Sequence, residues 1–194
     1  LKPSAGDVRL FGEVVTPDSL ALKRRVGVAF EQQSFYDEMT ALEYLLFFGR
    51  LYQVEKAGTR AAELLERLNL WHVRDLLIAG FSTGMQRKLS FARALLHAPE
   101  LLVLDEPVSG LDPFGIRQLR EILLEERAAG RTILISSHIL SEIEQTADRV
   151  GILARGKLIA EATTEDLRRK VSPVTRIDIE ITPPAERCPL YPSP

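Results

Sequence analysis

Hydrophobic residues recur at helical spacing in the first half of the chain. Thr40 followed by Glu43 forms a capping box, which is a sequence signature of a helix start. The apolar face of the next helix is expected on Ala62, Leu65 and Leu68. Three helices are predicted in this half: one that begins at Thr40, one from about Thr59 to Leu68, and one from about Ser82 to Ala94.

After Pro99 the pattern alternates between short apolar runs and longer helical stretches. Leu101 to Leu104 is a continuous apolar run that ends in acids, as a strand buried inside a parallel sheet does. The order of strand, helix, strand and helix indicates an α/β fold with parallel strands. The elements expected here are strands at Leu101–Leu104 and Thr132–Ser136 and helices at Pro113–Ala129 and Leu140–Asp148.

Strand patterns also mark both ends of the chain. Asp7 to Phe11 alternates like an edge strand, and Arg25 to Phe30 has the pattern of a short buried strand. Arg149 to Ala160 is predicted to be a hairpin that turns at Arg155-Gly156. Residues 172–182 alternate as an edge strand, and a Pro-rich tail follows from Pro183.

Composition adds limits on function. The 194 residues suit one domain, and 45% of them are hydrophobic. The formal net charge of −2 gives no basic excess that would favour nucleic acid. The lone Cys188 cannot form an internal disulfide, which fits a reducing cytosol. No apolar run approaches the roughly 18 to 20 residues that span a bilayer, so a membrane role would work through a partner.

Candidate chemistry begins with Asp105 and Glu106, at the end of the predicted strand Leu101–Leu104. Ligands of open α/β sheets bind at this carboxyl edge. An Asp there can hold Mg²⁺ beside phosphates, and a Glu one residue later can polarise an attacking water. Taken alone, a strand that ends in solvated acids explains the same residues equally well.

Three further segments are weak signals when taken singly. Ser82, within Ser82–Gln86, can cap a helix whose start approaches a phosphate, although an ordinary capped helix is commoner. Ser109–Asp112 alone is only a turn. His138 follows the strand Thr132–Ser136 and would share the sheet edge with the acids, although a lone histidine is more often structural.

The order and spacing of these segments carry the assignment. The run FSTGMQRKLSFARALLHAPELLVLDEPVSGLD, followed by SSH, resembles the ABC ATPase family. The resemblance implies a signature loop for nucleotide at Ser82, Thr83, Gly84, Met85 and Gln86, and a further nucleotide contact at Asp112. It also implies a metal-binding Asp105, a catalytic Glu106 and a switch histidine at His138.

The resemblance also implies a fold and a domain organisation. The fold would be of the P-loop NTPase (RecA-like) type, a mostly parallel sheet flanked by helices. A helical subdomain would be inserted at about residues 34–92. Residues 1–171 would form the ABC ATPase domain, and residues 172–194 an edge strand and tail.

One departure from the family pattern follows the strand that ends at Phe30. The family carries a glutamine loop here, but the residue in register is Glu31, followed by Gln32. The resemblance places both residues near the nucleotide and Glu31 near Mg²⁺. A glutamate can still meet Mg²⁺ and water, but it adds negative charge near a triphosphate.

A phosphate-binding loop of the form G-x-x-x-x-G-K-[S/T] is expected for this family. The nearest match, Gly151 to Leu158, ends in a residue that cannot bind Mg²⁺ and lies in the predicted hairpin. In the family this loop and its helix come just before a segment like Leu1–Gly6. The resemblance therefore implies a chain truncated at its N-terminus that lacks half of one ATP site.

The function implied by the resemblance is an ATP-binding and ATP-hydrolysing subunit of an ABC transporter, most similar to exporters. Its cofactors would be ATP and Mg²⁺. Its partners would be a second ABC subunit, in a homodimer or heterodimer, and a membrane-spanning permease. Its place would be cytoplasmic, peripheral on the inner face of the cell membrane, with no nucleic acid bound.

Two alternatives stay open. The chain could be a truncated non-catalytic remnant that contributes only a signature loop. It could also be a soluble ABC ATPase acting on ribosomes or DNA, although the stretch between Glu31 and Ser82 is short and has no extended heptads.

Overall fold

The computed structural model describes residues 3–166. The chain divides into two compact units, Leu1–Thr146 and Ala147–Pro194, which are described separately. The edge strand predicted at residues 172–182 and the tail after it lie outside the described residues. The described part of the chain has no helix long and apolar enough to cross a membrane.

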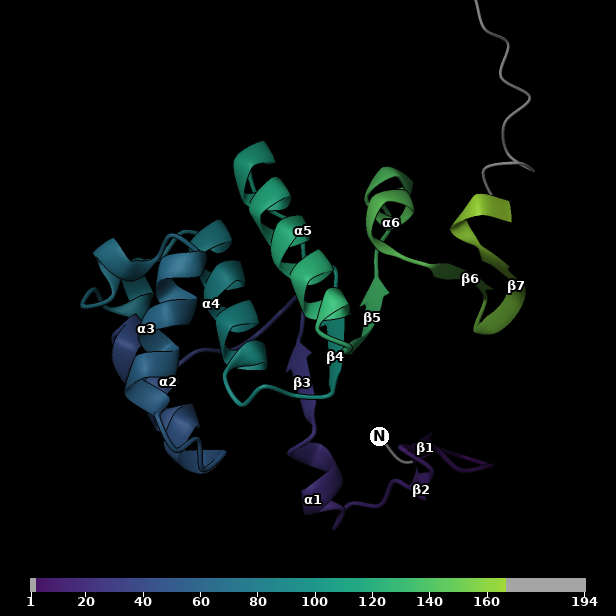
Figure 1. Ribbon diagram of the computed structural model, residues 1–194, viewed down its shortest axis with the longest axis horizontal. Coiled ribbons are helices and arrows are strands. Elements are labelled where there is room, and N and C mark those ends of the chain that lie inside the picture. The colour runs from purple at the N-terminus through teal and green to yellow at the C-terminus, as the bar shows by residue number, and fades with distance from the viewer. Residues whose placement is uncertain (1–2, 167–194) are drawn as a thin grey trace, which may run out of the picture. The chain divides into compact units, whose positions relative to one another are not determined.

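A three-stranded parallel sheet forms the centre of the first unit (Figure 1). Its strands lie in the order β3 (Val26–Ala29), β4 (Leu101–Asp105) and β5 (Thr132–Ser136). The helix α5 (Pro113–Ala128) connects β4 to β5, and α6 (Leu140–Thr146) follows β5. The predicted order of parallel strands and helices is thereby confirmed, and α6 ends before the predicted Asp148.

Three helices gather beside β3: α2 (Ala41–Leu51), α3 (Ala57–Arg67) and α4 (Thr83–Leu95) (Figure 1). Two short 3₁₀ helices, η1 (Trp71–Val73) and η2 (Ile78–Gly80), connect α3 to α4. The predicted capping box is confirmed, because Thr40 and Glu43 each bond the other's backbone N–H.

The predicted apolar face of the second helix needs one correction. Ala61 is fully buried and Ala62 is only partly buried, so the buried face lies one position away at that turn. A helix start that lies earlier than predicted, at Ala57, accompanies this shift. The buried face of α3 and its C-cap consists of Ala61, Leu64, Leu65 and Leu68.

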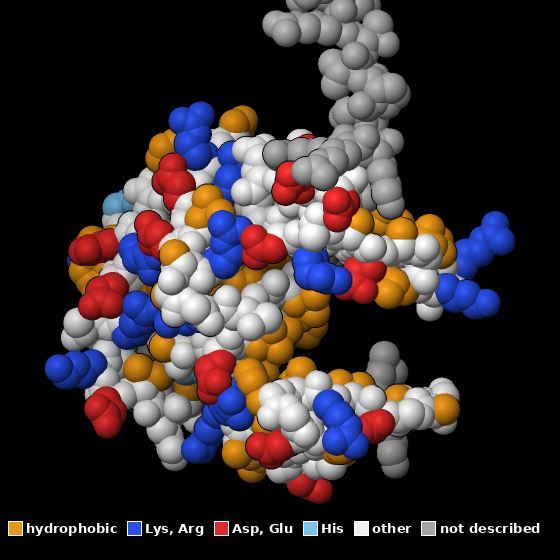
Figure 2. Space-filling view, turned by 45° about the vertical axis from the view of Figure 1, so that its right-hand side comes forward, with side chains coloured by type: hydrophobic (Ala, Val, Ile, Leu, Met, Phe, Trp, Pro, Cys, Tyr) orange, Lys and Arg blue, Asp and Glu red, His pale blue; other side chains and the backbone are white. Residues whose placement is uncertain are grey.

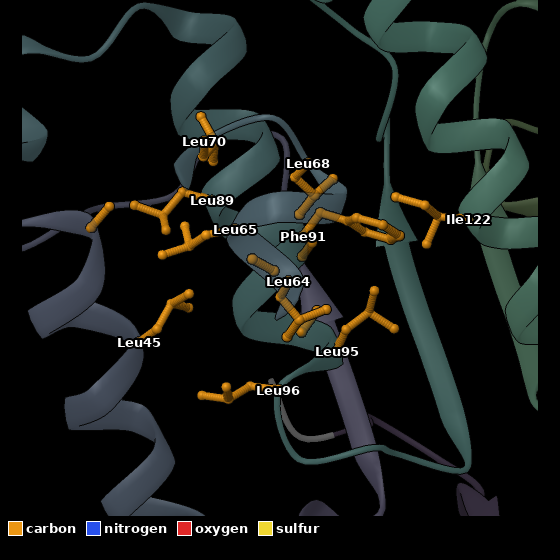
Figure 3. Close-up of a cluster of buried hydrophobic side chains, with 14 of the residues drawn as sticks. Leu45, Leu64, Leu65, Leu68, Leu70, Leu89, Phe91, Leu95, Leu96 and Ile122 are labelled. Atoms are coloured by element: carbon orange, nitrogen blue, oxygen red, sulfur yellow. The ribbon is translucent and has the colours of Figure 1, made fainter. Parts of the chain in front are cut away.

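The hydrophobic core fills the space between these helices and the sheet (Figure 3). The cluster contains leucines of α2, α3 and α4 together with Phe91 of α4 and Ile122 of α5. Gly27 of β3 lies against the last turn of α4, where an added Cβ would be 2.1 Å from the Ala94 carbonyl oxygen. A side chain at this position would therefore push the helix off the strand.

The start of the chain is less regular than predicted. The predicted strand Asp7–Phe11 is shorter in the structure: β1 (Arg9–Leu10) pairs with β2 (Glu13–Val14) in a small hairpin. Phe11 and Gly12 both have positive φ, so the chain turns where the strand was expected to end. The short helix α1 (Leu20–Lys23) follows.

The second unit contains an antiparallel hairpin of β6 (Arg149–Ala154) and β7 (Lys157–Thr163). Arg155 and Gly156 form its turn, both with positive φ, which confirms the predicted turn. Gly151–Leu158 therefore lies on two strands and their turn, so this segment is not a phosphate-binding loop between a strand and a helix.

Candidate functional site

The candidate site starts from two neighbouring strand ends. Asp105 closes β4 and stands in register with Ser136, the last residue of β5. The Ser136 hydroxyl donates a hydrogen bond to Oδ1 of Asp105. The Asp105 carboxylate is exposed at the carboxyl edge of the sheet, where open α/β folds bind their ligands.

Glu106 leaves the strand through an unusual backbone turn. Its φ of +47° lies in the left-handed region, which costs a residue with a side chain free energy. Its N–H is held by Ser136, at 3.1 Å from the backbone oxygen and 3.2 Å from Oγ. This turn carries the Glu106 side chain toward β5 rather than along β4.

His138 meets Glu106 at this edge. Its Nδ1 lies 2.9 Å from Oε2 of Glu106, and the His138 side chain is 73% exposed while that of Glu106 is 18% exposed. The hydrogen bond to Glu106 raises the pKa of His138, as do the negative charges of Glu106 and Glu31. A proton on Nδ1 is therefore shared toward the carboxylate, and Nε2 is left to face a ligand.

The predicted signature loop forms the start of α4. Ser82 is the N-cap, and its side chain accepts a hydrogen bond from the Met85 N–H at 3.3 Å. Thr83, Gly84, Met85 and Gln86 form the first turn of α4, and the Gln86 N–H donates to the Ser82 backbone oxygen at 2.9 Å. The helix dipole at this N-terminus favours an anion.

Glycines bring this loop against the segment Ser109–Asp112. A Cβ on Gly84 would lie 3.3 Å from the Gly110 oxygen, and Gly110 has a φ of +75°. The Asp112 side chain caps α5 by accepting a hydrogen bond from the Gly115 N–H at 2.8 Å. The loop and the turn that the sequence singled out are thus packed together, and Asp112 has a capping role of its own.

Glu31 and Gln32 follow β3 and are both exposed. Glu31 comes just after the carboxyl end of β3, which pairs in parallel with β4, so it lies at the same edge of the sheet. Its negative charge also raises the pKa of His138. Gln33, rather than Gln32, is the partly buried glutamine, and its side chain is held by hydrogen bonds. Its side chain accepts hydrogen bonds from Ser90 and Arg93 and donates to Tyr44, at 2.6 to 2.9 Å.

Two arginines of α4 were missed by the sequence reasoning. Arg87 is 9% exposed and bonds the backbone of both loops that flank the helix start. Arg93 reaches the Val28 oxygen at 3.0 Å and Gln33. For Arg87 the available signal was its helical spacing from the apolar residues Phe91 and Ala94.

The described residues fit a magnesium ion of the kind that accompanies a nucleotide. They contain no cluster of three or more His, Cys, Asp or Glu side chains that could hold a metal alone. Mg²⁺ commonly uses one or two carboxylates and completes its shell with water and substrate phosphates. The exposed Asp105 carboxylate, fixed by Ser136, suits this arrangement.

Comparison with known proteins decides the family. The sequence pattern of the family described as ABC transporter matches residues 1–109. A solved structure titled as the ATP binding subunit of an ABC transporter is 32% identical, with a TM-score of 0.80, over 88% of this chain and 72% of that one. The chain belongs to the ABC transporter family. The family resemblance and the α/β fold with a parallel sheet flanked by helices are therefore confirmed.

Curated relatives are named as ATP-binding proteins of transport or resistance. Bacitracin transport ATP-binding protein BcrA of Bacillus licheniformis is 43% identical over 88% of this chain and 56% of its own length. Daunorubicin/doxorubicin resistance ATP-binding protein DrrA of Streptomyces peucetius is 38% identical over 87% and 52%. The chain thus spans about half the length of these relatives. The structure of cbiO1 from Clostridium perfringens, 24% identical with a TM-score of 0.72, shares the fold.

Proposed function

We propose that this chain is the ATP-binding and ATP-hydrolysing part of an ABC transporter subunit that drives export through a membrane-spanning permease. The observation that carries the proposal is the pair of Glu106 and His138 beside Asp105, at the carboxyl edge of the sheet. Membership of the family supplies the reaction class. The geometry supplies residues suited to it.

Each residue at the edge has a role in this proposal. Asp105 and Glu31 would hold Mg²⁺, and the ion would supply positive charge to balance that of the transferred phosphoryl group. Glu106 orients the attacking water or takes its proton, and its left-handed backbone fixes the direction of its carboxylate. His138 donates from its ring to the negative charge that develops in the transition state.

The signature loop acts on nucleotide held by a second subunit. Ser82 to Gln86 and the adjacent Asp112 present a helix start that suits the terminal phosphate of that ATP. Two subunits, identical or different, would therefore close around ATP and open after hydrolysis. Closure would depend on the terminal phosphate of ATP, so the interface between the two subunits would act as a switch.

Export and location rest on the relatives. The names of the relatives from Bacillus licheniformis and Streptomyces peucetius refer to bacitracin transport and to daunorubicin/doxorubicin resistance. Both suit a protein that moves compounds out of the cell. We place the subunit at the cytoplasmic face of the membrane, bound to its permease through the helical subdomain at about residues 34–92, with no nucleic acid partner.

The proposal is tested by the steady-state rate of MgATP hydrolysis. The rate is measured on the protein as its gene encodes it, assembled with its permease. We expect Glu106→Gln to lower the rate at least about 100-fold, the usual contribution of a general base. Asp105→Asn should raise the Mg²⁺ requirement. Glu121→Gln, an exposed change on α5, is the matched control and should keep the wild-type rate. Undiminished hydrolysis in Glu106→Gln would refute the assignment.

A further inference from the structure

Arg87 lies on α4, directly after the signature loop Ser82–Gln86, and is 9% exposed. Its Nη1 donates to the backbone oxygens of Phe30 at 3.1 Å and Glu31 at 2.7 Å. Its Nε donates to the backbone oxygen of Ser109 at 3.3 Å. Among the described residues it makes no ion pair with a carboxylate, so its acceptors are carbonyl groups of two separate loops.

Burying a guanidinium costs free energy unless hydrogen bonds satisfy it. A residue kept in this position is therefore expected to do something that an apolar side chain cannot. Arginine has five N–H donors in a rigid fork and is always charged, so one side chain can hold two loops at once. Because the acceptors of Arg87 are all backbone oxygens, Arg87 fixes the path of the main chain and not the position of another side chain.

The two loops that Arg87 holds both lead to the candidate site. Phe30 and Glu31 follow β3, and Glu31 acts on His138 through its charge. Ser109 ends a turn in which its N–H donates to the Glu106 oxygen at 3.1 Å. Gly110 then packs against Gly84. Arg87 thus stands at the junction of Glu31, the turn that carries Glu106, and the start of α4.

We propose that Arg87 is a positioning residue that sets the backbone of Glu31 and of the Glu106 turn relative to the signature loop. This inference rests on the proposed function, which gives Glu31, Glu106 and the loop their roles in ATP hydrolysis. Arg87 links the half-site for the chain's own nucleotide to the surface offered to the partner's nucleotide. It touches neither nucleotide itself.

The test compares Arg87→Ala and Arg87→Lys with Arg131→Ala in the protein as its gene encodes it, with its permease. Arg131 is a suitable control because it is also largely buried and bonds a backbone oxygen, that of Pro99, which precedes β4. It lies directly before β5, at the end of that strand away from the site, so its loss should lower stability without moving the site. All three variants are compared at equal folded fractions.

The first readout is the Mg²⁺ concentration that gives half-maximal hydrolysis. Because small misplacements of catalytic groups have large effects, we expect Arg87→Ala to raise it at least about tenfold. Arg87→Lys, which can keep one contact, should be intermediate, and Arg131→Ala should match wild type. An equal shift in Arg87→Ala and Arg131→Ala would reduce Arg87 to a structural role and overturn the proposal.

The second readout is a double-mutant cycle that combines Arg87→Ala with Glu31→Gln and measures the Mg²⁺ requirement of each variant. If Arg87 acts by placing Glu31, the change at Glu31 should have little further effect once Arg87 is alanine. Additive effects on the Mg²⁺ requirement would contradict the proposal, because they would mean that the two residues act independently.

Amide hydrogen exchange separates this inference from the proposed function, since it needs no turnover. We expect the amides of Glu106 and Ser109 to exchange faster in Arg87→Ala than in Arg131→Ala. If the wild-type protein hydrolyses no ATP, the proposed function fails, and faster exchange still supports the positioning role. Equal exchange in the two variants would overturn that role whatever the activity. If Arg87→Ala does not fold, the same exchange measurement is made on Arg87→Lys.

Discussion

Nδ1 of His138 lies 2.9 Å from Oε2 of Glu106, and each residue comes just after the end of a different parallel strand. The contact exists because Glu106 turns off β4 with a positive φ, while His138 follows β5 after Ser136. Two separate backbone features must therefore hold for the pair to form. The pair joins the candidate base to the candidate charge-stabilising group.

Replacing Glu106 should change the titration of His138. The carboxylate holds the pKa of His138 above the ordinary 6.5, so the imidazole stays protonated to a higher pH than usual. As pH rises through that folded-state pKa, the attraction within the pair is lost. Glu106→Gln removes the charge, so the pKa of His138 should fall. Proton NMR titration of its ring measures this, and an unchanged pKa would show that the contact is absent in solution.

Gly27 should tolerate no side chain. A Cβ there would lie 2.1 Å from the Ala94 oxygen and 2.9 Å from Cγ of Pro99, so β3 and α4 would have to separate. We expect Gly27→Ala to lower the free energy of unfolding by about 1–3 kcal/mol. Gly80→Ala is the control, because an added Cβ at Gly80 meets nothing within 4 Å. Urea unfolding of both variants measures the difference, and equal stabilities would contradict the close approach.

His97 should make stability depend on pH. Its ring stacks on that of Tyr52 with the centroids 4.1 Å apart, and its Nε2 lies 3.2 Å from the Val26 oxygen. Its buried Nδ1 has no hydrogen-bond partner among the described residues. Burial lowers the pKa of His97 below 6.5, and the positive charge of Arg93 adds to this effect. The unfolded chain therefore takes up a proton first, so stability is fully present above about pH 6.5 and declines as pH falls toward the folded-state pKa.

Denaturant unfolding between pH 7 and 5 tests this dependence. We expect His97→Gln to flatten the decline in the free energy of unfolding, since the group that titrates is gone. His72→Gln, which removes an exposed histidine of η1, controls for the loss of one imidazole. A decline as steep in His97→Gln as in wild type would mean that other groups cause it.

The parts of the fold that depend on neighbours in sequence could be predicted. The capping box of Thr40 and Glu43 and the strand from Leu101 rest on local spacing, and both are confirmed. The order of strands and helices along the chain then identified the parallel sheet. The family resemblance came from motif order in the same way.

The parts that depend on distant contacts could not be predicted. The need for a glycine at position 27 is one example, because nothing in the sequence shows that Ala94 approaches it. The contacts of Arg87 had no local signal either, since its acceptors lie on loops far along the chain. The left-handed backbone of Glu106 has no signal in residue type, as glutamate does not favour it.

The most direct test of the central claim, that Glu106 drives ATP hydrolysis at this sheet edge, is the identity of the nucleotide that stays bound. Wild-type protein and Glu106→Gln, each as its gene encodes it, would be incubated with labelled MgATP and separated from free nucleotide. We predict intact ATP on Glu106→Gln, in a complex of two ABC subunits, and ADP on the wild type. ADP formed on Glu106→Gln at the wild-type rate would contradict the account.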